Sequence, residues 1–222
     1  MSAVLFGSIG ALADTSELQR EAFNESFRAH ALDWNWSRDE YRELLRESGG
    51  TSRIAAYAES RGDEVNAAAV HATKSEVFRK NLQMGGIEAR PGVVETIEQA
   101  QRDGVQVALV TTTSGENIAA LAHALRPRID VDSFALVVDT SDVAQFKPAP
   151  DAYEFALKRL DEQAGSCVAV EDNLGGLEAA VAAGVPCVAF PGENNVGHDF
   201  GQASRRVDSL SFAELQTLMS RH

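Results

Sequence analysis

The feature that most constrains the fold is an alternation of strand-like and helical segments in the C-terminal part of the chain. After Pro91-Gly92, buried-strand patterns are predicted at residues 105–110, 134–138, 168–170 and 187–190, and helical patterns lie at 94–104, 118–125, 152–160 and 177–183. Strands that alternate with helices form parallel sheets that helices cover on both faces. Together with the apolar run at 3–6, the pattern predicts an α/β fold with a doubly wound parallel sheet.

The N-terminal part differs in character, because residues from about 14 to 81 carry helical signals and hardly any strand pattern. A chain of 222 residues fits a core of about 130–150 residues with a smaller inserted module. We therefore predict a helical cap domain at 16–88, inserted after the first strand of a core domain made of 1–15 and 89–222.

Composition and charge exclude several classes of partner. The net charge of −13 and the pI of about 4.8 argue against nucleic-acid binding and against an anionic membrane surface, both of which need basic patches. No apolar run approaches 18 residues and no signal-peptide pattern is present, so a cytoplasmic location is expected. Cys167 and Cys187 lie in strand-like runs and are predicted to be reduced core thiols.

Polar residues follow several of the predicted strands. They are Thr111-Thr112, Lys147 a short loop past its strand, and Glu171-Asp172. Ligands of such sheets bind outside the carboxyl ends of the strands, where these residues are expected to converge. Hydroxyl and ammonium groups suit a phosphate, and the two carboxylates suit a hard cation such as Mg²⁺.

Each of these residues also has a simpler interpretation. Thr111 could be a helix cap, and Lys147 could be a solvated surface lysine. Glu171-Asp172 could begin the following helix, where the helix dipole favours carboxylates. The order and common location of the set favour a phosphate site over these separate readings.

Four segments together resemble the haloacid dehalogenase superfamily, in its subgroup of phosphosugar phosphatases and beta-phosphoglucomutases. They are 3–15 (with Gly10, Leu12 and Asp14-Thr15), 107–114, 147–151 and 171–184. The segment Gly197-His198-Asp199-Phe200 is similar to the xylulose-1,5-bisphosphate phosphatase branch. The resemblance covers essentially the whole chain and implies a Rossmann-like core with an all-helical cap.

The resemblance also implies substrate contacts from the cap. Gly50-Thr51-Ser52-Arg53 resembles the cap loop whose arginine contacts the distal group of the substrate. Lys74 stands four residues before Phe78, as a substrate lysine precedes an aromatic residue in that subgroup. Gln19 occupies the position of the family's usual histidine. For Arg53 and Lys74, ordinary surface charges remain the alternative.

The first motif departs from the family at its catalytic positions. Family members begin Asp-x-Asp-Gly-Thr-Leu, in which the first aspartate attacks phosphorus and the second is the general acid and base. Here Gly7 and Ile9 replace the two aspartates, and Ala11 replaces the threonine. Glycine has no side chain and isoleucine cannot transfer a proton, so we predict that no intact catalytic pair is present.

The residues around this loop cannot readily replace what is lost. In an extended segment, Ser8 is predicted to point to the opposite side from Gly7 and not to substitute for the nucleophile. The family resemblance implies Mg²⁺ at Glu171, Asp172 and the carbonyl of Ile9. One carboxylate ligand is missing, so this metal site is expected to be weakened.

The sequence therefore predicts a phosphatase-family protein that lacks the aspartyl-phosphate chemistry and retains a pocket for phosphate or a phosphosugar. Two alternatives remain open: an active Mg²⁺-dependent phosphosugar phosphatase with an unconventional route, and a pseudoenzyme that binds an unknown protein partner and no small ligand. Gly7→Asp combined with Ile9→Asp is predicted to restore activity if the rest of the site is intact.

Overall fold

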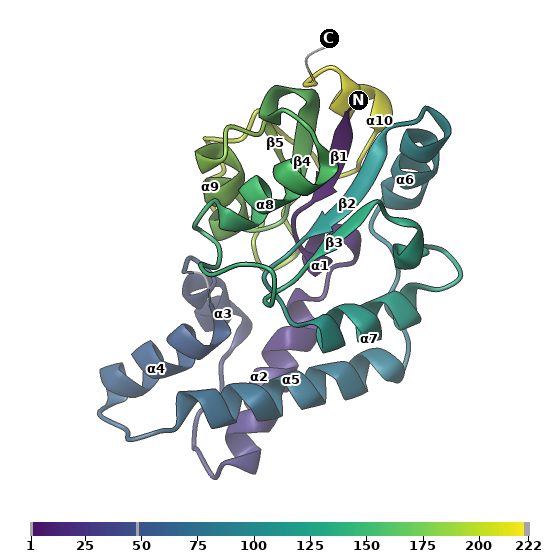
Figure 1. The fold of residues 1–222 in the computed structure, drawn as a ribbon. Helices are drawn as coiled ribbons and strands as arrows, with labels where there is room; N and C mark the ends of the chain where they lie inside the picture. Colours follow the sequence, from purple (N-terminus) through teal and green to yellow (C-terminus); the bar gives the residue numbers. More distant parts are fainter. Residues whose placement is uncertain (1, 48, 220–222) are drawn as a thin grey trace.

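A six-stranded parallel sheet forms the centre of the computed structural model, which describes residues 2–47 and 49–219. The strand order is β3-β2-β1-β4-β5-β6, and every neighbouring pair is parallel. Figure 1 labels the first five strands of the chain, β1 to β5. The strands are β1 Ala3–Phe6, β2 Gln106–Val110, β3 Leu136–Val138, β4 Cys167–Glu171, β5 Cys187–Ala189 and β6 Arg205–Arg206. The predicted α/β fold with a doubly wound parallel sheet is confirmed.

The two faces of the sheet build two separate hydrophobic clusters. On β1, Val4 and Phe6 belong to one cluster, and Ala3 and Leu5 belong to the other, as the two-residue period of a strand requires. The first face is covered by α6 Val93–Arg102, α7 Gly115–Leu125 and α10 Phe212–Gln216, and the second by α8 Asp151–Leu160 and α9 Leu174–Ala182. Two 3-10 helices, Val131–Ser133 and Ala164–Ser166, complete the connections.

The strand register brings three chain segments to one edge of the sheet. Phe6 pairs with Leu109 of β2 and with Val170 of β4, and the Gly7 amide continues the ladder by donating to the Val170 carbonyl at 2.9 Å. The segments that leave these strands therefore start side by side. They carry the first, second and fourth of the motifs identified in the sequence.

A helical insertion lies between β1 and β2, at the carboxyl end of the strands (Figure 1). Its helices are α2 Ser16–Ala29, α3 Arg38–Leu44, α4 Gly50–Arg61 and α5 Ala67–Gln83. A cluster of its own holds it together, with Phe23, Phe27, Trp34, Trp36 and Tyr41 in contact through tilted, edge-on and stacked rings. Helix α5 also packs against α7 of the sheet layer, which fixes the insertion over the strand ends.

Local structure differs from the sequence prediction in a few short elements. The segment after β1 forms a four-residue helix, α1 Ile9–Leu12, because Ser8 caps it by accepting from the Ala11 amide. The predicted cap loop that ends at Arg53 is the first turn of α4. Strand β6 and helix α10 were not predicted, since two and five residues are too short for a periodic pattern.

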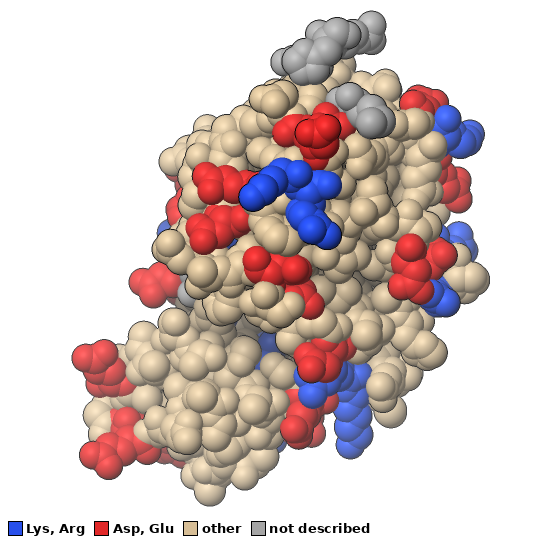
Figure 2. Space-filling view, in the orientation of Figure 1, with Lys and Arg blue, Asp and Glu red and all other residues tan. Residues whose placement is uncertain are grey.

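The surface carries mixed charges. Figure 2 shows acidic and basic side chains interspersed on one face, with no large basic patch there. Among the described residues, none of the helices is both long and apolar enough to cross a membrane. Cys167 and Cys187 are buried and free, as predicted.

Candidate functional site

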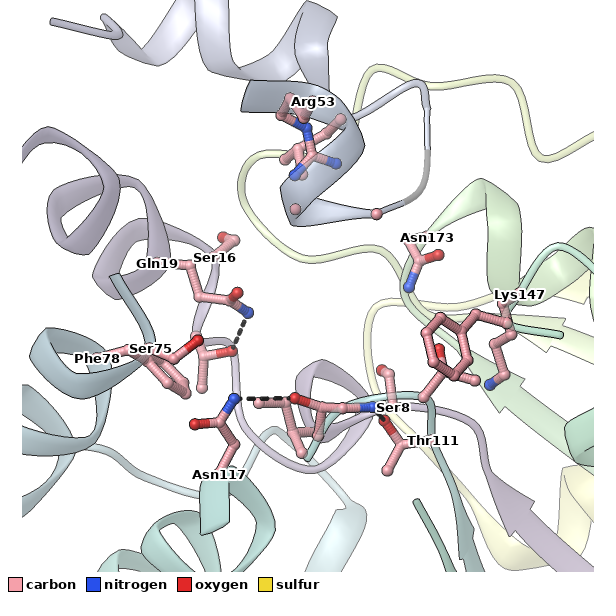
Figure 3. Close-up of a pocket in the computed structure, with 18 of the residues that line it drawn as sticks. Ser8, Ser16, Gln19, Arg53, Ser75, Phe78, Thr111, Asn117, Lys147 and Asn173 are labelled. Carbon is pink, nitrogen blue, oxygen red and sulfur yellow. Dashed lines mark hydrogen bonds between the residues drawn. The ribbon is translucent and has the colours of Figure 1, made fainter. Parts of the chain in front are cut away.

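A cavity of about 570 Å³ lies between the strand ends and the helical insertion. Its floor is formed by the loops after β1, β2 and β4, and its roof by residues of α2, α4 and α5. In Figure 3, Ser8, Thr111, Lys147 and Asn173 lie on one side, Gln19, Ser75 and Phe78 lie on another, and Arg53 approaches from α4. The fold thus brings the predicted core and cap residues to one space.

Glu171 fills the space at the former nucleophile position. A Cβ atom on Gly7 would lie 2.0 Å from Glu171 Oε1 and 2.3 Å from the Tyr153 hydroxyl oxygen, far inside contact distance. Glu171 is completely buried, and its other side faces Gly176, where a Cβ would lie 2.1 Å from Oε2. The carboxylate is therefore enclosed between two glycines, and a side chain at residue 7 would require Glu171 and Tyr153 to move.

Lys147 is the counter-ion of this carboxylate. Its ammonium donates to Glu171 Oε1 at 2.6 Å, to the Val110 carbonyl at 2.7 Å and to the Gly7 carbonyl. The Tyr153 hydroxyl donates to the same Glu171 oxygen at 2.7 Å. Burial raises the pKa of Glu171, and the Lys147 charge opposes part of that rise. All three ammonium hydrogens have protein acceptors, so Lys147 has none left to donate to a cavity ligand in this arrangement.

The residues present do not fit the resident Mg²⁺ that the family resemblance implies. Glu171 is directed to Lys147 and Tyr153, and Asp172 Oδ1 accepts from Ser8 Oγ at 2.6 Å and from Asn173 Nδ2 at 2.8 Å. The Ile9 carbonyl accepts from the Ala13 amide at 3.1 Å. Within the described ranges, no group of three or more His, Cys, Asp or Glu side chains is placed to hold a metal ion. A hard cation needs several oxygen ligands at once.

The sequence predicts that Ser8 does not replace the nucleophile, because its side chain is expected to point away from the direction of residue 7, but the structure places Ser8 at the cavity. A side chain at residue 7 would indeed point away from that of Ser8, because a Cβ built on Gly7 is directed at Glu171 and Tyr153 in the interior. Ser8, however, lines the cavity and donates to Asp172. The extended geometry separates the two directions as predicted, but it is the serine that faces the site.

The other floor residues have defined surroundings. Thr111 is buried, and its hydroxyl oxygen accepts from the Thr113 amide at 3.2 Å. Thr112 lines the cavity beside it. Ile9 is buried in the hydrophobic cluster and presents an apolar wall where the family has its second aspartate. The phosphate-binding role of Thr111, Thr112 and Lys147 stays a prediction.

The roof carries two cations without a carboxylate partner. Lys74 is buried between Phe23 and Phe78, with its ammonium 4.7 and 5.1 Å from the two ring centroids, and it donates to Gln19 Oε1 at 2.7 Å. Burial lowers the pKa of Lys74 to about 7, and the Arg53 charge adds to this effect. Arg53 donates to the carbonyls of Leu44 and Glu47. No salt bridge of either cation is found in the described part of the chain.

The simpler interpretations of single residues are wrong at several positions. Lys147 and Lys74 are not solvated surface charges, since both are almost completely buried. Ser114, not Thr111, caps α7 by accepting from the Asn117 amide. Glu171 ends β4, and α9 begins only after Asn173, so the helix dipole does not explain the carboxylate pair.

Sequence reasoning missed two residues that shape the site. Tyr153 bonds Glu171 from α8, and His71 lines the roof with its pKa lowered to about 4 by burial and by Lys74. Neither belongs to a motif. Tyr153 had one available signal: it lies two residues after the motif 147–151 on a helix that must pack against the sheet.

The sheet order, the inserted helical cap and the motif residues at the strand ends define a class of hydrolases. The model of the haloacid dehalogenase-like hydrolases matches residues 1–184, and the chain belongs to this family.

Within the family, the chain is similar to Protein CbbY of Cereibacter sphaeroides, with 42% identity over 97% of this chain and 94% of that protein. A crystal structure of CbbY from Rhodobacter sphaeroides in complex with phosphate has 41% identity and a TM-score of 0.86 over 97% of this chain and 96% of that one. A mutant of that CbbY in complex with xylulose-(1,5)bisphosphate has 40% identity and a TM-score of 0.87 over 99% and 100%. The predicted branch is confirmed.

Proposed function

We propose that this protein binds a phosphorylated sugar in the cavity and does not turn it over by the family's aspartyl-phosphate route. The observation that carries the proposal is the position of Glu171, whose carboxylate fills the volume beside Gly7. A carboxylate nucleophile is absent at residue 7, and a side chain there would have to displace Glu171 and Tyr153. Phosphoryl transfer to an aspartate needs that side chain.

The choice of a sugar phosphate as ligand rests on the relatives and on the roof of the cavity. CbbY binds phosphate in one crystal structure and xylulose-(1,5)bisphosphate in another. In this chain, Lys74 and Arg53 face the same cavity as Thr111 and Lys147. The two roof cations suit an anionic group at one end of the ligand, and the hydroxyl groups on the floor suit a phosphate or a polar sugar at the other.

Binding is proposed to need no divalent cation, because the Lys147 ammonium already neutralises Glu171. The absence of nucleic-acid and membrane partners rests on the acidic sequence and belongs to the same proposal, as does a cytoplasmic location.

Two assays on the purified chain test this function. In thermal-shift titrations, xylulose-1,5-bisphosphate should raise the melting temperature in proportion to the logarithm of ligand concentration above Kd. In a phosphate-release assay with the same ligand, no turnover above a blank is expected. The variant Arg126→Met removes an exposed cation at the C-terminal end of α7, away from the helix start that lines the cavity, and serves as the matched control for non-specific anion effects.

The outcomes separate the proposal from its alternatives. Turnover that persists through further purification would establish an active phosphatase with an unconventional route. No thermal shift with phosphate, sugar monophosphates or the bisphosphate would favour a pseudoenzyme that binds a protein partner alone.

A further inference from the structure

Ser8 combines three properties that neither the family pattern nor the proposed function uses. Its hydroxyl donates to Asp172 Oδ1 at 2.6 Å, which aims the proton at a carboxylate. Its oxygen accepts from the Ala11 amide at 3.0 Å, which fixes the side-chain rotamer. It lines the same cavity as Thr111 and Lys147 (Figure 3). A hydroxyl oxygen has two lone pairs, so one remains for a ligand atom.

The packing around Asp172 holds this pair together. A Cβ on Gly10 would lie 2.2 Å from Asp172 Oδ2, so the carboxylate reaches Ser8 only because residue 10 is glycine. Asn173 donates to the same Oδ1 at 2.8 Å and orients the carboxylate from the other side. Glu171 is neutralised by Lys147, which leaves Asp172 as the carboxylate at the floor of the cavity.

The geometry points to Ser8 as the acceptor of a phosphoryl group from the bound sugar phosphate, with Asp172 as its base. Ser8 Oγ forms a bond to phosphorus as the bond from phosphorus to the sugar oxygen breaks. The hydroxyl proton passes to Asp172, which later releases it to solvent, and the departing sugar oxygen on the far side of phosphorus takes a proton from water. The products are phosphoserine and a free sugar hydroxyl, and no other reactant is consumed.

The transfer stops after one event per chain. Hydrolysis of the phosphoserine would need a general base that activates a water molecule on the far side of phosphorus. In the family the second aspartate of the first motif is that base, and in this chain the position holds the buried, apolar Ile9. Uncatalysed hydrolysis of phosphate monoesters is among the slowest reactions in water. The inference rests on the proposed binding of a sugar phosphate. The two can be told apart by experiment, since binding alone leaves Ser8 unmodified.

Mass spectrometry of the full chain tests the inference. The protein is incubated with excess xylulose-1,5-bisphosphate and, separately, with acetyl phosphate, and then digested and sequenced. We expect the mass of one phosphoryl group on the peptide that contains Ser8. Asp172→Asn, which keeps a hydrogen-bonding partner but removes the base, should slow the transfer by about 10²-fold.

Two controls separate acceptor chemistry from helix capping. Ser8→Ala should abolish the modification, and Ser8→Thr, which keeps a hydroxyl and a cap, should retain it on threonine. Ser37→Ala removes the equivalent cap of α3 outside the cavity and should leave the modification unchanged.

Each possible result either supports or refutes Ser8 as the phosphoryl acceptor. A thermal shift without any modified Ser8 overturns the acceptor role and leaves the binding function standing. Equal modification of Ser8→Ala, or modification at another residue, overturns it as well. Release of inorganic phosphate that Ser8→Ala abolishes would support the acceptor and refute the absence of turnover. Absence of both binding and modification would refute both proposals.

Discussion

The floor and the roof of the cavity handle charge in opposite ways. On the floor, Lys147 is paired with Glu171 at 2.6 Å and its three hydrogens have protein acceptors. On the roof, Lys74 is equally buried, but its partner in the described structure is the neutral amide of Gln19. The paired floor stabilises the fold, whereas a buried cation without a counter-ion is costly and suits a ligand that brings the opposite charge.

The difference indicates how the family site has changed in this chain. With glycine at residue 7 there is no empty hole, because Glu171 fills the space and pairs with Lys147 beside the Gly7 carbonyl. The roof holds cations that the proposed ligand would pair with, while the floor holds a self-satisfied ion pair. Five predictions test this contrast.

The largest effect is expected for Lys147→Met. The substitution leaves the Glu171 carboxylate buried without its cation, which should lower the free energy of unfolding by about 3–5 kcal/mol. Urea denaturation measures it. Adding Glu171→Gln removes the orphaned charge and should recover part of the loss, whereas Arg46→Met, which breaks the exposed pair with Glu43, should change little. Equal losses in the single and double variants would show that the floor is not organised around this pair.

The second effect concerns the packing at Gly7. Gly7→Ala inserts a methyl group 2.0 Å from Glu171 Oε1 and should destabilise the chain by about 1–3 kcal/mol. Gly197→Ala is the matched control, since nothing lies within 4 Å of its Cβ position. For the same steric reason, Gly7→Asp with Ile9→Asp should not restore phosphatase activity, contrary to the expectation from the sequence. Activity in that double variant would show that Glu171 readily leaves the space.

The third effect separates stability from binding on the roof. Lys74→Met should weaken sugar-phosphate binding by about ten- to a hundredfold, through the loss of a charge-assisted hydrogen bond. It should also raise the melting temperature of the unliganded chain, because it removes an unpaired buried cation. Calorimetric titration and thermal denaturation measure the two. A variant that loses stability and keeps affinity would assign Lys74 a purely structural role.

The pH dependence of Lys74 has a definite sign. Its folded-state pKa of about 7 lies below the usual value of 10.5, so between these values the unfolded chain binds more protons. Stability of the unliganded chain should therefore rise with pH across that window, and Lys74→Met should flatten the slope. Binding of an anionic ligand should have the opposite trend and weaken as pH rises through about 7, since the ammonium loses its proton.

The sequence predicted the architecture well because periodicity carries it. The alternation after Pro91 predicted the parallel sheet. The bounds of β1 agree with the prediction, and those of β2 and β4 differ from it by no more than one residue at each end. The motif residues were predicted as one site because parallel strands end at the same edge. Their hydrogen-bond partners could not be predicted, since the Ser8 side chain caps a short helix that has no periodic pattern, and the position of Glu171 depends on glycines at 7 and 176.

The smallest effect is expected from Mg²⁺, and it tests the floor most directly. A divalent cation could bind only if Glu171 left Lys147 and Tyr153 and turned to the cavity beside Asp172, which would leave a buried ammonium without its carboxylate. That rearrangement opposes binding, so millimolar Mg²⁺ or its removal by EDTA should leave both the melting temperature and the affinity for a sugar phosphate unchanged. If Mg²⁺ raises either quantity and Asp172→Asn abolishes the rise, the two carboxylates still form a metal site and the floor is not closed.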